Sequence, residues 1–446
     1  MNTTPDSIRQ LSSRFVTAKL IVIGVLLVLF FIPSVMVSAL VQERSGRQQD
    51  TTQEVGGQWG KAQAVVGPIL MIPYRTAVEN HRIEYAYFLP ETVAIKNNVT
   101  VETRSRGIYA VPVYEERAEL TGSFAQPNIA ALNIHPSQFL FDKATAIIGI
   151  PDLRGVKREI VMQWAGREYR FASGVETRVV SNGVSTGVAL PRGGRIPFSV
   201  TLELRGSEAL AFSPVGKTTK VTMESNWSSP SFTGSFLPAT HTITDTGFTA
   251  EWELLDLNRS FPQQWTGETD YRFVFDHDIF TKNNGRDSDR FGLRFMLPVD
   301  VYDKTGRSVK YAMAVLALVF ASVFFTESTS RRRVHPAQYL LIGLALIIFY
   351  ALLLSLAEYI PFGYAYLIAG VAIIGMVTLF TRSVTKSTRL GVINGGILTA
   401  LYGFVYVLLQ MEDFTLLIGS IGLFVMLAIM MFVSRKINWY GTEDAQ

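Results

Sequence analysis

Residues 335–359 read "HPAQYLLIGLALIIFYALLLSLAEY" and predict a helix that crosses a membrane. His335 and Pro336 mark its start, because proline is favoured at the first position of a helix. No charged residue lies between Pro336 and Glu358. With a rise of about 1.5 Å per residue, a run of this length covers a hydrocarbon core of roughly 30 Å. The helix is therefore expected to end at the membrane boundary, where the chain reaches the carboxylate of Glu358.

Five other apolar runs have a similar length, which gives six predicted membrane-spanning helices. The six runs cover residues 20–40, 309–325, 338–357, 362–381, 390–409 and 414–433. The first run could instead be a signal peptide, but the apolar part of a signal peptide has only about 7–15 residues. We therefore expect this run to remain as an anchor. The composition agrees, because the 446 residues are 48% hydrophobic and 17% charged.

Lysine and arginine predict which side of the membrane each segment faces. If the N-terminus is inside, the short segments on that side hold eleven lysines and arginines, and the short turns on the other side hold none. The inner segments are residues 1–19, 326–337, 382–389 and 434–446, and the outer turns are residues 358–361 and 410–413. Because positive residues accumulate on the cytoplasmic side, both termini are expected in the cytoplasm.

Four of the residues before the quoted helix are expected to act as topology anchors on the cytoplasmic side. They are Arg331, Arg332, Arg333 and His335. Contact with a lipid headgroup or a partner protein is the alternative role for them.

The region between the first two predicted helices, residues 42–308, is expected to be a periplasmic domain rich in β-structure. Apolar and polar residues alternate with period two in several runs, and turn-forming clusters separate them. These runs are residues 83–90, 98–104, 196–206, 220–225 and 248–255. A helical stretch near residues 124–140 is also expected. The domain could form one large sandwich or two smaller ones, and its five tryptophans are expected in the core.

The predicted fold class is therefore an α+β membrane protein with a sandwich-like periplasmic domain and six membrane helices. Its parts are a cytoplasmic N-terminus (1–19), a first helix (20–40), the periplasmic domain (42–308), a bundle of five helices (309–433) and a cytoplasmic tail (434–446). The sequence pI of about 9.1 reflects the basic inner segments, because residues 42–310 have equal numbers of acidic and basic residues. Nucleic acid is therefore not expected as a partner. There is no cysteine, so a disulfide framework is excluded.

Acidic residues are predicted to gather at the outer ends of two helical hairpins. Glu358 ends the helix quoted above, and Gln410, Glu412 and Asp413 lie in the outer turn between the last two predicted helices. Carboxylates at membrane depth are usually paired or functional. If the acidic residues pair with Arg307 or Lys310, their role is structural. The alternatives are a binding site for a ligand, ion or partner, and a site of proton transfer.

Three short patterns resemble catalytic or metal motifs, but their context argues against them. "GVSTG" (183–187) fits G-x-S-x-G, yet strand and turn residues follow it where a nucleophile elbow needs a helix. "SVTK" (383–386) lies in an inner turn, and "DHD" (276–278) has no further histidine at ligand spacing. We therefore expect no catalytic, cofactor-binding or metal-binding residues. "GVING" (391–395) fits GxxxG and favours close helix packing within the chain over dimerisation.

The C-terminal third resembles the CreD family of inner-membrane, cell-envelope-integrity proteins of Gram-negative bacteria. The resemblance rests on "HPAQYLLIGLALIIFYALLLSLAEYIPFGYAYLIAG" (335–370), "LYGFVYVLLQMEDFTLLIGSIGLF" (401–424) and "INWYG" (437–441). "VVGPILMIPY" (65–74) and "GSFLP" (234–238) extend it into the external domain. Tyr359 departs from the family pattern, where a histidine is expected after the glutamate, and this puts in doubt any mechanism that needs an imidazole there.

The resemblance implies a multi-pass protein of the bacterial inner membrane that supports envelope integrity and the response to β-lactams. It implies no reaction and no cofactor, so a non-enzymatic protein is expected. Its partners would be the lipid bilayer and an envelope protein or amphiphile bound by the periplasmic domain. The alternatives are a small transporter or lipid-handling protein and, less favoured, a membrane-bound hydrolase.

Overall fold

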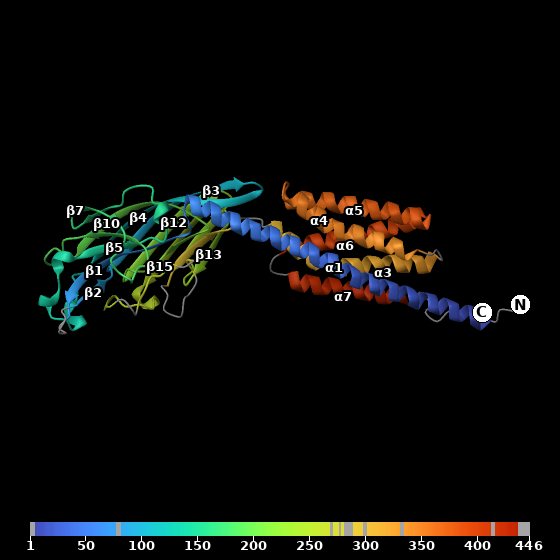
Figure 1. Ribbon diagram of the computed structural model, residues 1–446, viewed down its shortest axis with the longest axis horizontal. Helices are drawn as coiled ribbons and strands as arrows, with labels where there is room; N and C mark the ends of the chain where they lie inside the picture. Colours follow the sequence, from blue (N-terminus) through green and yellow to red (C-terminus); the bar gives the residue numbers. More distant parts are fainter. Residues whose placement is uncertain are drawn as a thin grey trace. The chain divides into compact units, whose positions relative to one another are not determined.

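The computed structural model describes residues 5–76, 82–267, 271–275, 278–280, 289–297, 301–330, 334–411 and 415–435. The chain divides into two compact units. The helical unit comprises Met1–Arg47 and Val299–Gln446, and the β unit comprises Gln48–Pro298. Figure 1 shows the strands of the β unit and the helices of the helical unit along the chain.

Two sheets form the described part of the β unit. The first has strand order β13-β17-β11-β1-β5-β9-β8, with β2 paired to β1 and β16 paired to β2. Its strands are β1 Gln63–Arg75, β2 Ile83–Phe88, β5 Thr145–Gly149, β8 Ala172–Ser173, β9 Gly183–Gly187, β11 Ala209–Phe212, β13 Pro230–Gly234, β16 Gln264–Thr266 and β17 Phe291–Phe295. The second has order β14-β15-β12-β3-β4-β10-β6-β7. Its strands are β3 Thr92–Arg106, β4 Tyr109–Phe124, β6 Val161–Trp164, β7 Arg167–Arg170, β10 Ile196–Ser207, β12 Thr218–Ser225, β14 Thr240–Thr244 and β15 Gly247–Leu255.

The two sheets share one hydrophobic core, so the β unit is a single sandwich and not two. Inward side chains of both sheets, such as Ile69 of β1 and Leu120 of β4, belong to the same buried cluster. The five runs that were predicted as strands all contain strands, because alternation of apolar and polar residues places one face in this core. Of the five tryptophans expected in the core, Trp164, Trp252 and Trp265 are buried and Trp227 packs against the core, whereas Trp59 lies outside it.

The helix expected near residues 124–140 is absent, and that prediction was wrong. The chain there forms short 3-10 turns, η1 Ile129–Leu132 and η2 Pro136–Gln138, with η3 Phe141–Lys143 following. Pro127 and Pro136 lack the backbone N–H that a continuous helix needs.

The helical unit contains α2 to α7 and α1 as far as Arg47, and the remaining residues of α1 belong to the β unit. Their bounds are α1 Pro5–Trp59, α2 Val301–Lys310, α3 Ala312–Ser330, α4 Pro336–Ala357, α5 Phe362–Thr385, α6 Thr388–Gln410 and α7 Thr415–Ser434. Among the described residues, α1, α4, α5 and α6 are long and apolar enough to span a membrane, and α2 with α3 gives a fifth span bent by 43°. The apolar part described for α7, Leu417–Phe432, is shorter. Four or five spans are thus supported, and the sixth stays a prediction.

Two predicted boundaries differ from the structure because hydropathy detects only the apolar part of a helix. α1 does not end at residue 40 but continues through polar residues to Trp59, which is the last residue of the helix. The β-structure therefore begins at Gln63 and not near residue 42. The second predicted helix, residues 309–325, is preceded by the separate polar helix α2, and the break falls at Tyr311.

Glycines in the GxxxG pattern bring α5 and α6 together within the chain. A Cβ added at Gly391 would lie 2.8 Å from Cβ of Arg382, and one added at Gly395 would lie 2.4 Å from Oγ1 of Thr378. These are closer than atoms of real side chains approach, so the expected use of the pattern in packing within the chain is confirmed.

A buried ion pair joins α1 to α3 in the helical unit. Lys19 Nζ donates to Oε1 of Glu327, and both side chains are almost fully buried. Lys19 also donates to the carbonyl of Val334 at 2.5 Å, while the hydroxyl of Tyr339 donates to Glu327 Oε2 at 3.0 Å. Each charge is therefore met by polar groups from other elements, as a charge in a low-dielectric interior requires.

We predict that breaking this ion pair destabilises the helical unit. Glu327→Ala leaves Lys19 buried without its counter-charge, and the expected cost is about 3 kcal/mol. The measurement is thermal unfolding of the full chain in detergent, in a cycle of Lys19→Met, Glu327→Ala and both together. The double variant should lose less stability than the sum of the losses in the two single variants. Strictly additive losses would show that Lys19 and Glu327 do not interact. Glu43→Ala, which removes an exposed carboxylate of α1, is the control.

A second buried polar pair lies within the sandwich, on the inward face of the eight-stranded sheet. Asn97 Nδ2 of β3 donates to Glu116 Oε2 of β4 at 3.0 Å, and Glu116 is 2% exposed. Burial raises the pKa of Glu116 to about 8, although the bond from Asn97 lowers it. Glu116 is therefore protonated in the folded state at neutral pH.

We predict that Glu116 makes the sandwich less stable as pH rises. Its pKa is higher in the folded state than in the unfolded chain, so the folded state binds the extra proton between about pH 4.5 and 8. Unfolding free energy falls across this range, by an amount on the order of 5 kcal/mol, and levels off above it. Glu116→Gln should flatten this slope.

The measurement is denaturant unfolding of the full chain in detergent at pH 5 and pH 8.5. Tryptophan fluorescence reports on the β unit, which holds five of the six tryptophans. Glu119→Gln changes an exposed carboxylate on the same strand and should keep the wild-type slope. Equal slopes in Glu116→Gln and wild type would refute the assignment.

Candidate functional site

Glu358 caps the C-terminal end of α4 and is held by residues of α1 and α2. Its carboxylate lies 3.8 Å from Arg44 Nε and accepts a hydrogen bond from Tyr302 Oη at 3.4 Å. Its side chain is only 9% exposed, whereas that of Arg44 is 36% exposed. The carboxylate is therefore largely removed from solvent and neutralised by one arginine.

Gln410, at the C-terminal end of α6, contacts the same helix that contacts Glu358. Lys304 Nζ of α2 donates to Gln410 Oε1 at 3.4 Å. Tyr302 and Lys304 lie two residues apart on α2, so α2 connects the ends of α4 and α6. The structure thus brings Glu358 and Gln410 to one end of the helical unit. Glu412 and Asp413 lie outside the described residues.

The counter-charge of Glu358 differs from the one predicted. Arg307 and Lys310 were named as the possible counter-charges, but in the described residues the cation paired with Glu358 is Arg44. The reason is the length of α1: the helix runs beyond its apolar part and carries Arg44 to the end of α4. The sequence signal that could have found Arg44 is the helix-forming composition of residues 41–55, which hydropathy ignores.

His335 has a structural role at the opposite end of α4. Its Nδ1 accepts a hydrogen bond from the backbone N–H of Ala337 at 3.2 Å, and Gln338 Oε1 accepts one from the backbone N–H of His335 at 2.9 Å. This is a capping box that begins the helix. The anchors Arg331, Arg332 and Arg333 lie outside the described residues.

Two of the patterns that were set aside as catalytic or metal motifs make structural contacts in the described residues. "GVSTG" is strand β9, and Ser185 Oγ donates to the carbonyl of Gly174 at 2.8 Å. Asp278, the described residue of "DHD", pairs with Arg294 at 2.5 Å. No helix follows the serine, because residues 188–195 form irregular structure and bends and strand β10 begins at Ile196, which confirms that the nucleophile elbow is absent.

The last turn of α1 is fastened to the sandwich by Trp59. The guanidinium carbon of Arg104 lies 3.6 Å from the centre of the indole ring and that of Arg205 lies 4.2 Å from it. The indole N–H donates to the carbonyl of Tyr114 at 3.3 Å. Such cation–π contacts and one hydrogen bond fix the ring between β3, β4 and β10. This clamp, made by Trp59, Arg104 and Arg205, was not foreseen from the sequence.

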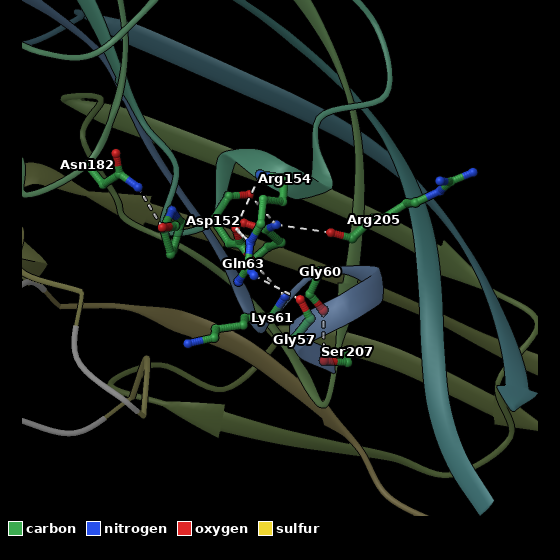
Figure 2. A network of polar contacts seen from close by, with 10 residues as sticks. Gly57, Gly60, Lys61, Gln63, Asp152, Arg154, Asn182, Arg205 and Ser207 are labelled. Atoms are coloured by element: carbon green, nitrogen blue, oxygen red, sulfur yellow. Dashed lines mark hydrogen bonds and ion pairs between the residues drawn. The ribbon is translucent and has the colours of Figure 1, made fainter. Parts of the chain in front are cut away.

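A polar network continues this attachment where α1 passes into β1 (Figure 2). Asp152 accepts from the backbone N–H of Lys61 at 3.1 Å and from Arg154 Nε at 2.9 Å, and Arg154 donates to the carbonyl of Gly57 at 2.9 Å. Burial tends to raise the pKa of Asp152, but these bonds outweigh it and hold the pKa below its usual value. Gln63 Nε2 donates to the carbonyl of Asp152 at 3.0 Å. The carboxylate thus organises the end of α1.

A polar groove of about 590 Å³ lies on the outward face of the eight-stranded sheet. Outward side chains form a row across four paired strands, with Thr242 beside Thr249, Thr249 beside Glu224 and Glu224 beside Asn98. Further hydroxyl and amide groups line it, from Thr100, Ser225, Asn226, Thr244 and Thr246. This threonine groove, as it is named below, offers donors and acceptors to a polar ligand.

Comparison with known proteins identifies the family. The profile of the CreD family, described as inner membrane protein CreD, matches residues 15–440. The chain is 30% identical over 426 residues to the inner membrane protein CreD of Escherichia coli (strain K12), covering 93% of this chain and 91% of that relative. The apolar helices α1, α4, α5 and α6 fit a multi-pass protein in contact with the lipid bilayer. The chain therefore belongs to the CreD family of inner membrane proteins.

Proposed function

We propose that this chain is a non-enzymatic protein that supports the integrity of the cell envelope during stress such as exposure to β-lactams. Its sandwich would lie in the periplasm and both termini in the cytoplasm, as the eleven lysines and arginines of the inner segments favour. The sandwich would bind an envelope component, either a protein or an amphiphile, in the threonine groove.

One observation carries the proposal: strand β3 joins the threonine groove to the end of α1. Asn98 and Thr100 of β3 line the groove, and Arg104 of the same strand stacks on Trp59. At about 3.4 Å per residue, roughly 14 Å of strand separates Thr100 from Arg104. A ligand that straightens or bends β3 would therefore act directly on the helix that enters the membrane.

Filling the threonine groove is predicted to abolish the protective role. Thr249→Arg and Thr100→Arg place a long charged side chain in the groove from exposed strand positions, so the fold should be retained. The measurement is dye uptake by a strain that lacks the gene, challenged with a β-lactam and complemented at matched membrane levels. Thr201→Arg, on the outward face of β10 outside the groove, should rescue like wild type. Full rescue by the groove variants would overturn the groove as the binding surface.

The contact between Glu358 and Arg44 is predicted to couple α1 to the bundle. Glu358→Gln keeps the shape of the side chain but removes the charge that Arg44 meets, so rescue in the dye-uptake assay should fall at least about twofold. Reversing both charges, with Arg44→Glu and Glu358→Arg, should restore part of it. Glu43→Gln removes a neighbouring exposed carboxylate of α1 and should change nothing. If Glu358→Gln rescues as well as the wild type, the contact between Glu358 and Arg44 has only a structural role.

A further inference from the structure

A groove of about 600 Å³ lies between α5 and α6, which pack against each other in the helical unit. Its volume is typical of sites for small ligands. The walls are aromatic and aliphatic, and they include Tyr366, Leu367, Val371, Tyr402 and Tyr406. Leu367 and Val371 are more than half exposed, so on a membrane-spanning helix the groove opens toward lipid and not toward water.

Glycines give this groove its depth. Gly370 of α5 and Gly403 of α6 line it, and a Cβ added at either position would meet no atom within 4 Å. Along α5 the lining runs from Pro361 to Ile374, which is about 20 Å of helix. That length slightly exceeds half of a hydrocarbon core of about 30 Å. The groove therefore matches one extended acyl chain of a lipid in the leaflet at the Glu358 end.

The end of the groove at Pro361 lies near the basic helix α2. The ammonium of Lys304 on α2 is 5.9 Å from the centre of the Phe362 ring, and that ring is 6.0 Å from the ring of Tyr366. Lys304 donates to the neutral amide oxygen of Gln410, a contact that does not compensate its positive charge. Of the basic residues of α2, Lys304 is the one whose ammonium contacts Phe362. A phosphate at this end of the groove would find that ammonium within reach.

We propose that the groove between α5 and α6 binds an anionic phospholipid, with one acyl chain against Gly370 and Gly403 and the phosphate beside Lys304. The apolar wall of the groove favours an acyl chain, and the ammonium of Lys304 favours a negatively charged headgroup. This binding is independent of the threonine groove and would hold even if the proposed envelope role failed.

Native mass spectrometry of the purified full chain in neutral detergent tests the proposal. Phosphatidylglycerol and phosphatidylcholine with identical chains are titrated separately, and inorganic phosphate is added as a competitor. The expected result is roughly fivefold tighter retention of phosphatidylglycerol, as one charge contact would give. Because binding needs the acyl chain, inorganic phosphate should compete poorly. Equal retention of the two lipids, or displacement by phosphate alone, would overturn the proposal.

Matched variants separate the acyl chain from the headgroup. Gly370→Leu combined with Gly403→Leu fills the groove and should remove retention of both lipids. Gly375→Leu is the control, because a Cβ there also meets no atom within 4 Å but the residue does not line the groove. Lys304→Gln should abolish only the preference for phosphatidylglycerol, whereas Lys310→Gln should preserve it. Unchanged retention after the double glycine substitution, or equal effects of the two lysine substitutions, would overturn the proposal.

Discussion

A buried carboxylate needs a nearby cation, and in the helical unit two such carboxylates obtain theirs from α1. Glu327 of α3 pairs with Lys19, and Glu358 at the end of α4 pairs with Arg44. The two cations are 25 residues apart, about 38 Å of helix, so they fix α1 near both ends of the bundle. An unpaired charge at the buried Lys19–Glu327 pair would cost several kcal/mol, whereas the half-exposed Arg44 loses less. The position of α1 along the other helices is therefore strongly specified.

The same helix ends in the β unit, where the means of attachment changes with the surroundings. The sandwich surface is exposed to solvent, and isolated ion pairs there contribute little. Trp59 is instead held between two guanidinium groups, and Asp152 gathers hydrogen bonds from Lys61 and Arg154. Cation–π contacts and several directed hydrogen bonds therefore hold the last turn of α1 against the sandwich.

Buried polar groups elsewhere make similar cross-element contacts. Within the bundle, Ser322 Oγ of α3 donates to Asn394 Oδ1 of α6 at 2.5 Å. Within the sandwich, Asn97 and Glu116 join β3 to β4. Each contact would be lost if one element slid along the other, so these groups specify register at some cost in stability. β3 has a further importance, because it contributes to the core, the threonine groove and the clamp on Trp59.

Local patterns in the sequence determined the elements, and only the tertiary structure decided which of them meet. The apolar runs predicted α4, α5 and α6 closely, and the alternating runs predicted strands such as β10 and β15, because both patterns arise within one turn or a few residues. The end of α1 at Trp59 was missed, since polar helix residues have no hydropathy signal. Lys19 and Glu327 are 308 residues apart, and nothing local to either residue indicates that packing will bring them together. For the candidate site, the sequence identified Glu358 and Gln410, but Arg44 and α2 became its partners only through the way the helices pack.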